Sequence, residues 1–156
     1  MDRIDRDILA LLQDNADLPL SEIASRVKLS STPCWRRIQR LEEQGYIQRR
    51  VAILDAKKLN AGVTVFVLLR TNRHNQEWFE KLREVVSAIP EVVDFYRMSG
   101  NIDYLLRVVV PDIAAYDAIY QKLTRDIEIY EVSSSFAMEE IKHTSALPLG
   151  YAPLDD

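Results

Sequence analysis

The sequence predicts an α+β protein of two domains, with three short helices in its N-terminal part and a β-α-β-β-α-β unit behind them. In the part before Gly45, apolar residues recur every three or four positions, which is the helical period. From Val63 onward, β-branched runs alternate with amphipathic segments, as in a mixed fold. The charge also divides, since residues 1–61 carry a net charge of +2 and residues 62–156 a net charge of −6.

Three helical segments are expected before Gly45. The predicted inward residues are Ile4, Ile8, Leu11 and Leu12 in the first, which runs from Asp2 to Asn15, and Leu20, Ile23, Ala24 and Val27 in the second. Ser30 or Ser31 can cap the third helix, whose first turn tolerates Pro33. Gly45 follows as a left-handed residue that ends this helix.

Residues 46–62 connect the two predicted domains. Residues 46–54 alternate loosely and indicate a strand pair or wing. Residues 55–62 contain Asn60 and Gly62 and are typical of a linker. The expected domains are therefore residues 1–62 and residues 63–156.

The second domain should contain four strands and two helices. The predicted strands are Val63–Thr71, Val92–Met98, Asp103–Val110 and Val132–Ile141. The predicted helices are Gln76–Ile89, with Phe79, Leu82, Val86 and Ile89 inward, and a second one from Pro111-Asp112, with Tyr116, Tyr120 and Leu123 inward. This order of elements is that of the ferredoxin-like fold.

Three short helices with a tight turn between the second and third describe a helix-turn-helix, and the expected wing after them makes it a winged helix-turn-helix. Cys34, Ile38 and Leu41 share the face of the third helix that should pack on the other two. The residues predicted to face DNA have side chains that read base edges or phosphates, and they are Ser31, Thr32, Arg36, Gln39 and Arg40, with Arg49 and Arg50 beyond the helix. Trp35 is expected to pack at the edge of the core.

Other classes of site find little support in the sequence. Nothing in it resembles a catalytic triad, a phosphate loop or a zinc motif. The single cysteine, Cys34, excludes an intrachain disulfide and is expected to be a buried apolar residue. His74 and His143 are expected at the surface. We therefore predict no metal, no cofactor and no enzymatic activity, and expect a cytoplasmic protein without a membrane segment.

Four runs of residues resemble the Lrp/AsnC family of bacterial and archaeal regulators. They are Asp2–Arg6, Ser30–Glu42, Gly45–Ile47 and Gly100–Leu106, and the resemblance covers about residues 1–150. It implies a transcription regulator that binds double-stranded DNA through a helix-turn-helix at about Leu20–Gln39. It also implies a ferredoxin-like regulatory domain that forms dimers, often assembled into tetramers or octamers, and that binds an amino acid as effector.

The family resemblance places the effector near the turn formed by Gly100, Asn101, Ile102 and Asp103. The Asp103 carboxylate could accept hydrogen bonds from a ligand ammonium, and Gly100 lets a ligand approach the backbone. The alternative is that both residues only shape a hairpin. Many family members carry an acidic and an aromatic residue at the positions of Asn101 and Ile102, so leucine is not assumed as effector. Ser134 and Ser135 are further candidate contacts.

Two alternative functions remain open from the residues alone. Ferredoxin-like domains host many enzymes, and the N-terminal helices could instead bind protein. The convergence of Arg36, Gln39 and Arg40 on one face favours DNA. A chain that reads a pseudo-palindromic operator should be a homodimer, and the apolar strands Val63–Leu69 and Val108–Val110 are the expected contact surface. The effector, the operator and the direction of regulation are not specified by the sequence.

Overall fold

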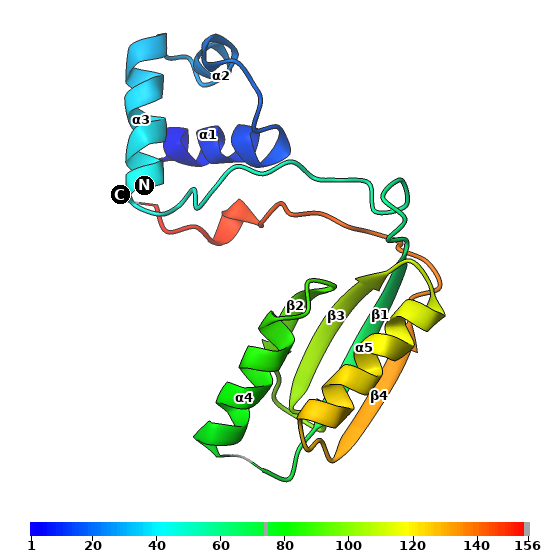
Figure 1. Cartoon of the computed structure of the whole chain (residues 1–156). Helices are drawn as coiled ribbons and strands as arrows, with labels where there is room; N and C mark the ends of the chain where they lie inside the picture. The colour runs from blue at the N-terminus through cyan, green and yellow to red at the C-terminus, as the bar shows by residue number, and fades with distance from the viewer. Residues whose placement is uncertain (74, 155–156) are drawn as a thin grey trace. The chain divides into compact units, whose positions relative to one another are not determined.

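The computed structural model describes residues 1–73 and 75–154, and it confirms the α+β class (Figure 1). The chain forms two compact units, Met1–Ile53 together with the segment from Lys142 onward, and Leu54–Ile141. Of the two histidines expected at the surface, His143 is exposed and His74 lies outside the described residues.

The first unit contains the three expected helices, α1 (Arg3–Asp14), α2 (Leu20–Arg26) and α3 (Ser31–Glu43). Burial of apolar side chains holds them together, since each fully buried leucine or isoleucine side chain contributes about 1.5–3 kcal/mol. The buried apolar residues are Ile8, Leu12, Ile23, Ala24, Cys34, Ile38 and Leu41. The inward faces of α1 and α3 are thus those that the helical period predicts.

Two residues with positive φ delimit α3. Lys28, in the turn after α2, has a φ of 57°. Gly45, with a φ of 77°, follows the helix, and its N–H donates to the carbonyl of Glu42 at 3.0 Å. L side chains disfavour this conformation and glycine does not, so Gly45 ends the helix as predicted.

The strand pair expected at residues 46–54 is wrong for the single chain, because no strand forms there. Val51, Ile53 and Leu54 are 63%, 70% and 68% exposed. A two-stranded ribbon is stable only where one of its faces is buried, and among residues 1–73 and 75–154 nothing buries these side chains.

The segment from Lys142 onward groups with the helices of the first unit. The Gln13 side chain donates to the Leu147 carbonyl at 3.1 Å and accepts from the Leu147 N–H at 3.0 Å. The boundaries of these two units differ from those of the domains predicted from the sequence. The prediction places residues 54–62 with the helices and the C-terminal segment with the sheet.

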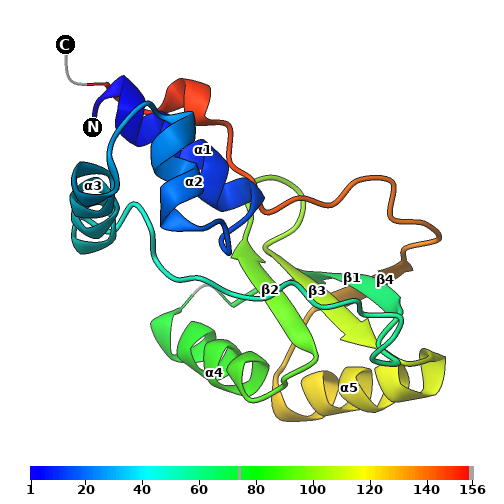
Figure 2. The same ribbon diagram turned by 90° about the horizontal axis from the view of Figure 1, so that it is seen from above.

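The second unit is an antiparallel sheet with strand order β2-β3-β1-β4. The strands are β1 (Val63–Arg70), β2 (Val92–Arg97), β3 (Tyr104–Val110) and β4 (Glu131–Phe136), and the helices are α4 (Gln76–Ser87) and α5 (Ile113–Asp126). Both helices lie on the same face of the sheet (Figures 1 and 2). This is the predicted ferredoxin-like arrangement.

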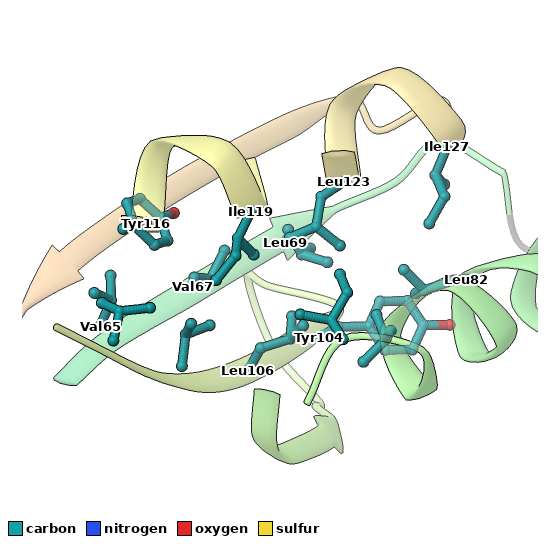
Figure 3. Packing of buried hydrophobic residues seen from close by; sticks show 14 of the residues in the cluster. Val65, Val67, Leu69, Leu82, Tyr104, Leu106, Tyr116, Ile119, Leu123 and Ile127 are labelled. Carbon is teal, nitrogen blue, oxygen red and sulfur yellow. The ribbon is translucent and has the colours of Figure 1, made fainter. Parts of the chain in front are cut away.

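The core of the second unit lies between the sheet and its two helices. Alternate residues of β1 and β3 point toward the helices, as period-two alternation requires. Figure 3 shows Val67 and Leu69 facing Ile119 and Leu123 of α5. Tyr120, expected inward, is 37% exposed, and Ile119 is buried in its place. In α4 the buried aromatic residue is Trp78, while Phe79 is only partly buried.

β4 is shorter than the predicted strand, which was expected to reach Ile141. Its last paired residue, Phe136, lies opposite Val65, and the Ala137 N–H still donates to the Thr64 carbonyl at 2.9 Å. β1 begins at Val63, so a longer β4 would have no backbone partner.

We call the face of the sheet opposite α4 and α5 the outer face. Paired strands place the following residues on it: Thr64, Phe66 and Leu68 of β1, Asp94 and Tyr96 of β2, Leu105, Arg107 and Val109 of β3, and Ser133 and Ser135 of β4. Arg107 pairs with Asp94 across two strands. The outer face thus carries apolar side chains on β1 and β3, interrupted by the ion pair between Arg107 of β3 and Asp94 of β2.

No helix in residues 1–73 or 75–154 is long and apolar enough to span a membrane.

Candidate functional site

The surface of α3 away from the core is polar and basic. Burial of Cys34, Ile38 and Leu41 fixes the rotation of the helix. That rotation leaves Ser31, Thr32, Arg36 and Arg40 exposed and Gln39 partly buried, while Arg49 and Arg50 are exposed beyond the helix. The structure therefore exposes four of the five predicted helix residues on the surface of α3, where they could reach a DNA groove, while Gln39 is only partly exposed there.

Trp35 was expected to pack at the edge of the core, and this is wrong. Its side chain is 51% exposed, beside Arg36 on the same helix. Cys34, Ile38 and Leu41 already fill the seam against α1 and α2, so the next position along the helix points past it.

Asp5 of α1 is a buried carboxylate that holds α3. Its side chain is 1% exposed, and its two oxygens accept from Arg37 Nη1 and from Arg40 Nη2, each at 2.8 Å. Arg37 Nη1 also donates to Asp2 at 2.6 Å. A buried charge is tolerated only when it is paired and hydrogen-bonded, and both conditions are met here.

Asp2 and Asp5 also cap α1 reciprocally. The Asp5 N–H donates to the Asp2 side chain at 2.8 Å, and the Asp2 N–H donates to Asp5 at 3.1 Å. Partial burial raises the pKa of Asp2, but hydrogen bonds from the Asp5 backbone and the Arg37 guanidinium outweigh it and leave that pKa below its ordinary value. The same two carboxylates raise the pKa of Arg37.

This network was missed from the sequence. The spacing of Asp2 and Asp5 is that of a capping box, which could have identified the helix start. Their ion pairs with Arg37 and Arg40 span 32 to 35 positions along the chain. Arg40 is therefore both a predicted DNA contact and a residue that ties α3 to α1.

The turn that the sequence singled out lines a pocket in the second unit. The cavity has a volume of about 390 Å³ and is lined by Arg70, Thr71, Asn72, Gly100, Asn101, Asp103 and Tyr130. Gly100 has a φ of 118°, a backbone conformation that residues other than glycine rarely adopt. Three of the six predicted effector residues thus come together.

The other three predicted effector residues are placed differently. Ile102 belongs to the turn but is not among the lining residues. The Ser134 hydroxyl is hydrogen-bonded to the Tyr116 hydroxyl on the helix side of the sheet. Ser135 lies opposite Phe66 on the outer face.

Asp103 has a structural partner within the chain. One of its carboxylate oxygens accepts from the Thr71 N–H at 2.8 Å, and its own N–H donates to the Leu69 carbonyl at 2.9 Å. These bonds join the end of β1 to the turn before β3. The carboxylate keeps further acceptor capacity, since an ionised carboxylate has about four lone-pair sites.

Arg70, Asn72 and Tyr130 are pocket residues that sequence reasoning missed. The Arg70 guanidinium pairs with Glu131 at 2.9 Å and lies 5.9 Å from the centre of the Tyr130 ring. Pairing of β1 with both β3 and β4 brings these distant segments together. The pocket therefore offers a cation, amides, a phenol and a carboxylate within one small volume.

Comparison with known families assigns different functions to the two parts of the chain. Residues 1–48 match a family model described as winged helix-turn-helix DNA-binding, and residues 64–147 match one described as the Lrp/AsnC ligand binding domain. Together with the exposed face of α3 and the pocket, these matches define a DNA-binding transcription regulator with a ligand-binding domain.

The chain belongs to the Lrp/AsnC family. It is 46% identical over 96% of its length to the DNA-binding transcriptional activator DecR of Escherichia coli K12, of which it covers 99%. It is 44% identical over 96% of its length to the glutamate uptake regulatory protein of Zymomonas mobilis, of which it covers 91%.

Solved structures agree with this assignment. An AsnC family transcriptional regulator from Agrobacterium tumefaciens is 60% identical with a TM-score of 0.95, and the match covers 98% of this chain and 100% of that one. A Neisseria meningitidis transcriptional regulator in complex with L-Met is 33% identical with a TM-score of 0.92, covering 97% and 98%.

Proposed function

We propose that this regulator inserts α3 into the major groove of a pseudo-palindromic operator and reads it with the exposed polar face. The observation that supports this is the burial of Cys34, Ile38 and Leu41, which leaves Thr32, Arg36 and Gln39 on the opposite side of the helix. Such side chains hydrogen-bond base edges and phosphates. The proposal places the protein in the cytoplasm with the DNA and gives its second domain a binding role and not a catalytic one.

Arg36→Ala should weaken binding to a duplex selected from random sequence by about 1–3 kcal/mol, because a guanidinium that forks onto guanine is lost. Arg49→Ala removes a predicted phosphate contact, so it should weaken all duplexes alike and lower the salt dependence by about one counterion. Fluorescence anisotropy over a range of salt concentrations measures both. Equal affinity of the Arg36→Ala and parent proteins for the selected duplex would show that another face binds DNA.

We also propose that the pocket around Gly100 and Asp103 binds a free amino acid. Arg70 can hold the ligand carboxylate, and the remaining acceptor sites of Asp103 can receive its ammonium. The lining side chains are polar, which favours a polar amino acid over leucine. The Neisseria relative in complex with L-Met supports an amino-acid ligand.

Asp103→Asn should weaken amino-acid binding by at least about tenfold, because a hydrogen bond to a charged group contributes about 1.5–3 kcal/mol. The variant keeps an oxygen that can accept from the Thr71 N–H, so the turn should persist while the charge is lost. Titration calorimetry with the twenty amino acids, first on the parent and then on the variant, measures the change.

The outcomes of this experiment separate the parts of the proposal. An amino acid that binds Asp103→Asn as tightly as the parent would place the binding site elsewhere. A parent protein that binds no amino acid would refute the effector part of the proposal. DNA binding by Asp103→Asn should equal that of the parent, because Asp103 is in the second unit and α3 is in the first.

We propose further that the protein acts as a homodimer, because a two-fold operator is matched by a two-fold protein. The outer face supplies the contact surface, since Phe66, Leu68, Leu105 and Val109 lie on it. Assembly of such dimers into tetramers or octamers would use other surfaces, because the two-fold interface occupies the outer face of both subunits. Operator half-sites should be spaced by about 10 base pairs or multiples of that distance.

A further inference from the structure

Glu42, in the last turn of α3, contacts two of the predicted DNA-facing residues. Its Oε2 accepts from Gln39 Nε2 at 3.0 Å, and its Oε1 accepts from Arg50 Nη2 at 2.9 Å. Gln39 and Glu42 are three positions apart, a spacing at which side chains meet on a helix. Arg50, beyond the helix, holds the other carboxylate oxygen, so Glu42 is restrained from both sides.

This contact fixes which way the Gln39 amide points. An ionised carboxylate only accepts hydrogen bonds, whereas a glutamine amide has a donating NH₂ group and an accepting oxygen. The group that faces Glu42 must therefore be the NH₂ group. Gln39 is left with its Oε1 acceptor and its second N–H for another partner.

The remaining donor and acceptor of Gln39 match one purine better than the other. In the major groove, adenine presents the N7 acceptor beside the N6 amino donor, whereas guanine presents two acceptors, N7 and O6. An amide that offers one donor and one acceptor pairs with adenine at both positions. Against guanine, the Gln39 oxygen would face the O6 oxygen, which is unfavourable.

We propose that Glu42 is a positioning residue that restricts Gln39 to adenine and so sets part of the sequence specificity. The inference rests on the proposed function, in which α3 reads base edges. Without Glu42, the Gln39 amide can rotate and turn both of its N–H groups toward guanine. Glu42 itself then needs no contact with DNA to influence which base is preferred.

Glu42→Ala is expected to lower the preference for adenine over guanine by at least about fivefold, the lower end of what a bidentate base contact contributes. The base position is identified first as the one whose preference changes in Gln39→Ala. The readout is the ratio of dissociation constants for duplexes that differ only at that base pair. Loss of a negative charge near DNA strengthens binding to every duplex, and the ratio cancels this effect.

Two variants serve as controls. Glu43→Ala removes the same charge one residue along the helix, and it should leave the ratio unchanged. Glu42→Gln keeps an oxygen at the same reach, so it should retain a larger ratio than Glu42→Ala. When Gln39 is already alanine, adding Glu42→Ala should change the ratio no further, because the residue through which Glu42 acts is absent.

The failure of this inference and the failure of the proposed function give different results. If Gln39→Ala alters the preference at no base position, Gln39 does not read a base edge, and the proposed function fails at this residue together with the role of Glu42. If Gln39→Ala alters one position while Glu42→Ala leaves that ratio within twofold, roughly the uncertainty of such measurements, the positioning role of Glu42 is overturned. Equal ratios for Glu42→Ala and Glu43→Ala would overturn it as well.

Discussion

Asp5→Ala is expected to destabilise the DNA-binding unit by about 3 kcal/mol, although the residue lies on α1 and is not itself a predicted DNA contact. Removing one partner of a buried ion pair costs about 3–5 kcal/mol. The lower end applies because the side chains of Arg37 and Arg40 are 24% and 49% exposed and can turn to solvent. The Asp2 N–H also loses its cap acceptor.

Hydrogen exchange resolved by segment measures this effect within the full chain. Protection of amides in α1 and α3 should fall by about 100-fold, the equivalent of 3 kcal/mol. Protection in β1 and β3 should not change, because they belong to the other unit. Asp7→Ala is the matched control, since Asp7 is an exposed aspartate on the same helix. Equal protection in the Asp5→Ala and Asp7→Ala proteins would show that the network contributes nothing to stability.

The helices and strands of this protein could be predicted because their signals are local. The helical period of Ile8, Leu12, Ile38 and Leu41 reports which side of each helix is buried, whatever the partner. Gly45 likewise reports the end of α3 through its own backbone freedom. The order of elements then limits the second unit to few topologies.

The predictions that were wrong or missing concern residues whose contact partners are distant in sequence or outside the chain. Residues 46–54 alternate like a strand, yet a strand forms only when another backbone pairs with it. Trp35 has an aromatic side chain that favours burial, but its position on α3 points away from the seam. An acidic residue on an amphipathic helix ordinarily faces solvent, so nothing local identifies Asp5 as buried.

The two candidate sites differ in how much of each could be predicted from the sequence, and the reason is again whether the signal is local. The exposed face of α3 follows from one helix and its burial pattern, so Thr32 and Arg36 could be placed from sequence. The pocket combines three segments, and only the Gly100–Asp103 turn carries a local signal. Arg70 and Tyr130 join it through strand pairings that the sequence does not specify.

Leu68→Glu is expected to convert the proposed dimer into a monomer. Leu68 of β1 lies on the outer face, with Leu105 opposite it on one side and Ser133 on the other. A carboxylate buried there without a partner costs several kcal/mol. In a two-fold interface the change occurs in both subunits, so the dissociation constant should rise by at least about 100-fold.

Sedimentation at micromolar concentration should therefore show the 18.0 kDa species for Leu68→Glu and a larger species for the parent. Ala118→Glu adds the same charge at an exposed position of α5, on the helix side of the sheet, and should sediment like the parent.

The Leu68→Glu monomer should keep its fold, because this side chain points away from the core between the sheet and its helices. It should also lose affinity for a two-half-site operator far more than for a single half-site, since only the former requires two copies of α3. A Leu68→Glu protein that sediments like the parent would show that the subunits meet elsewhere.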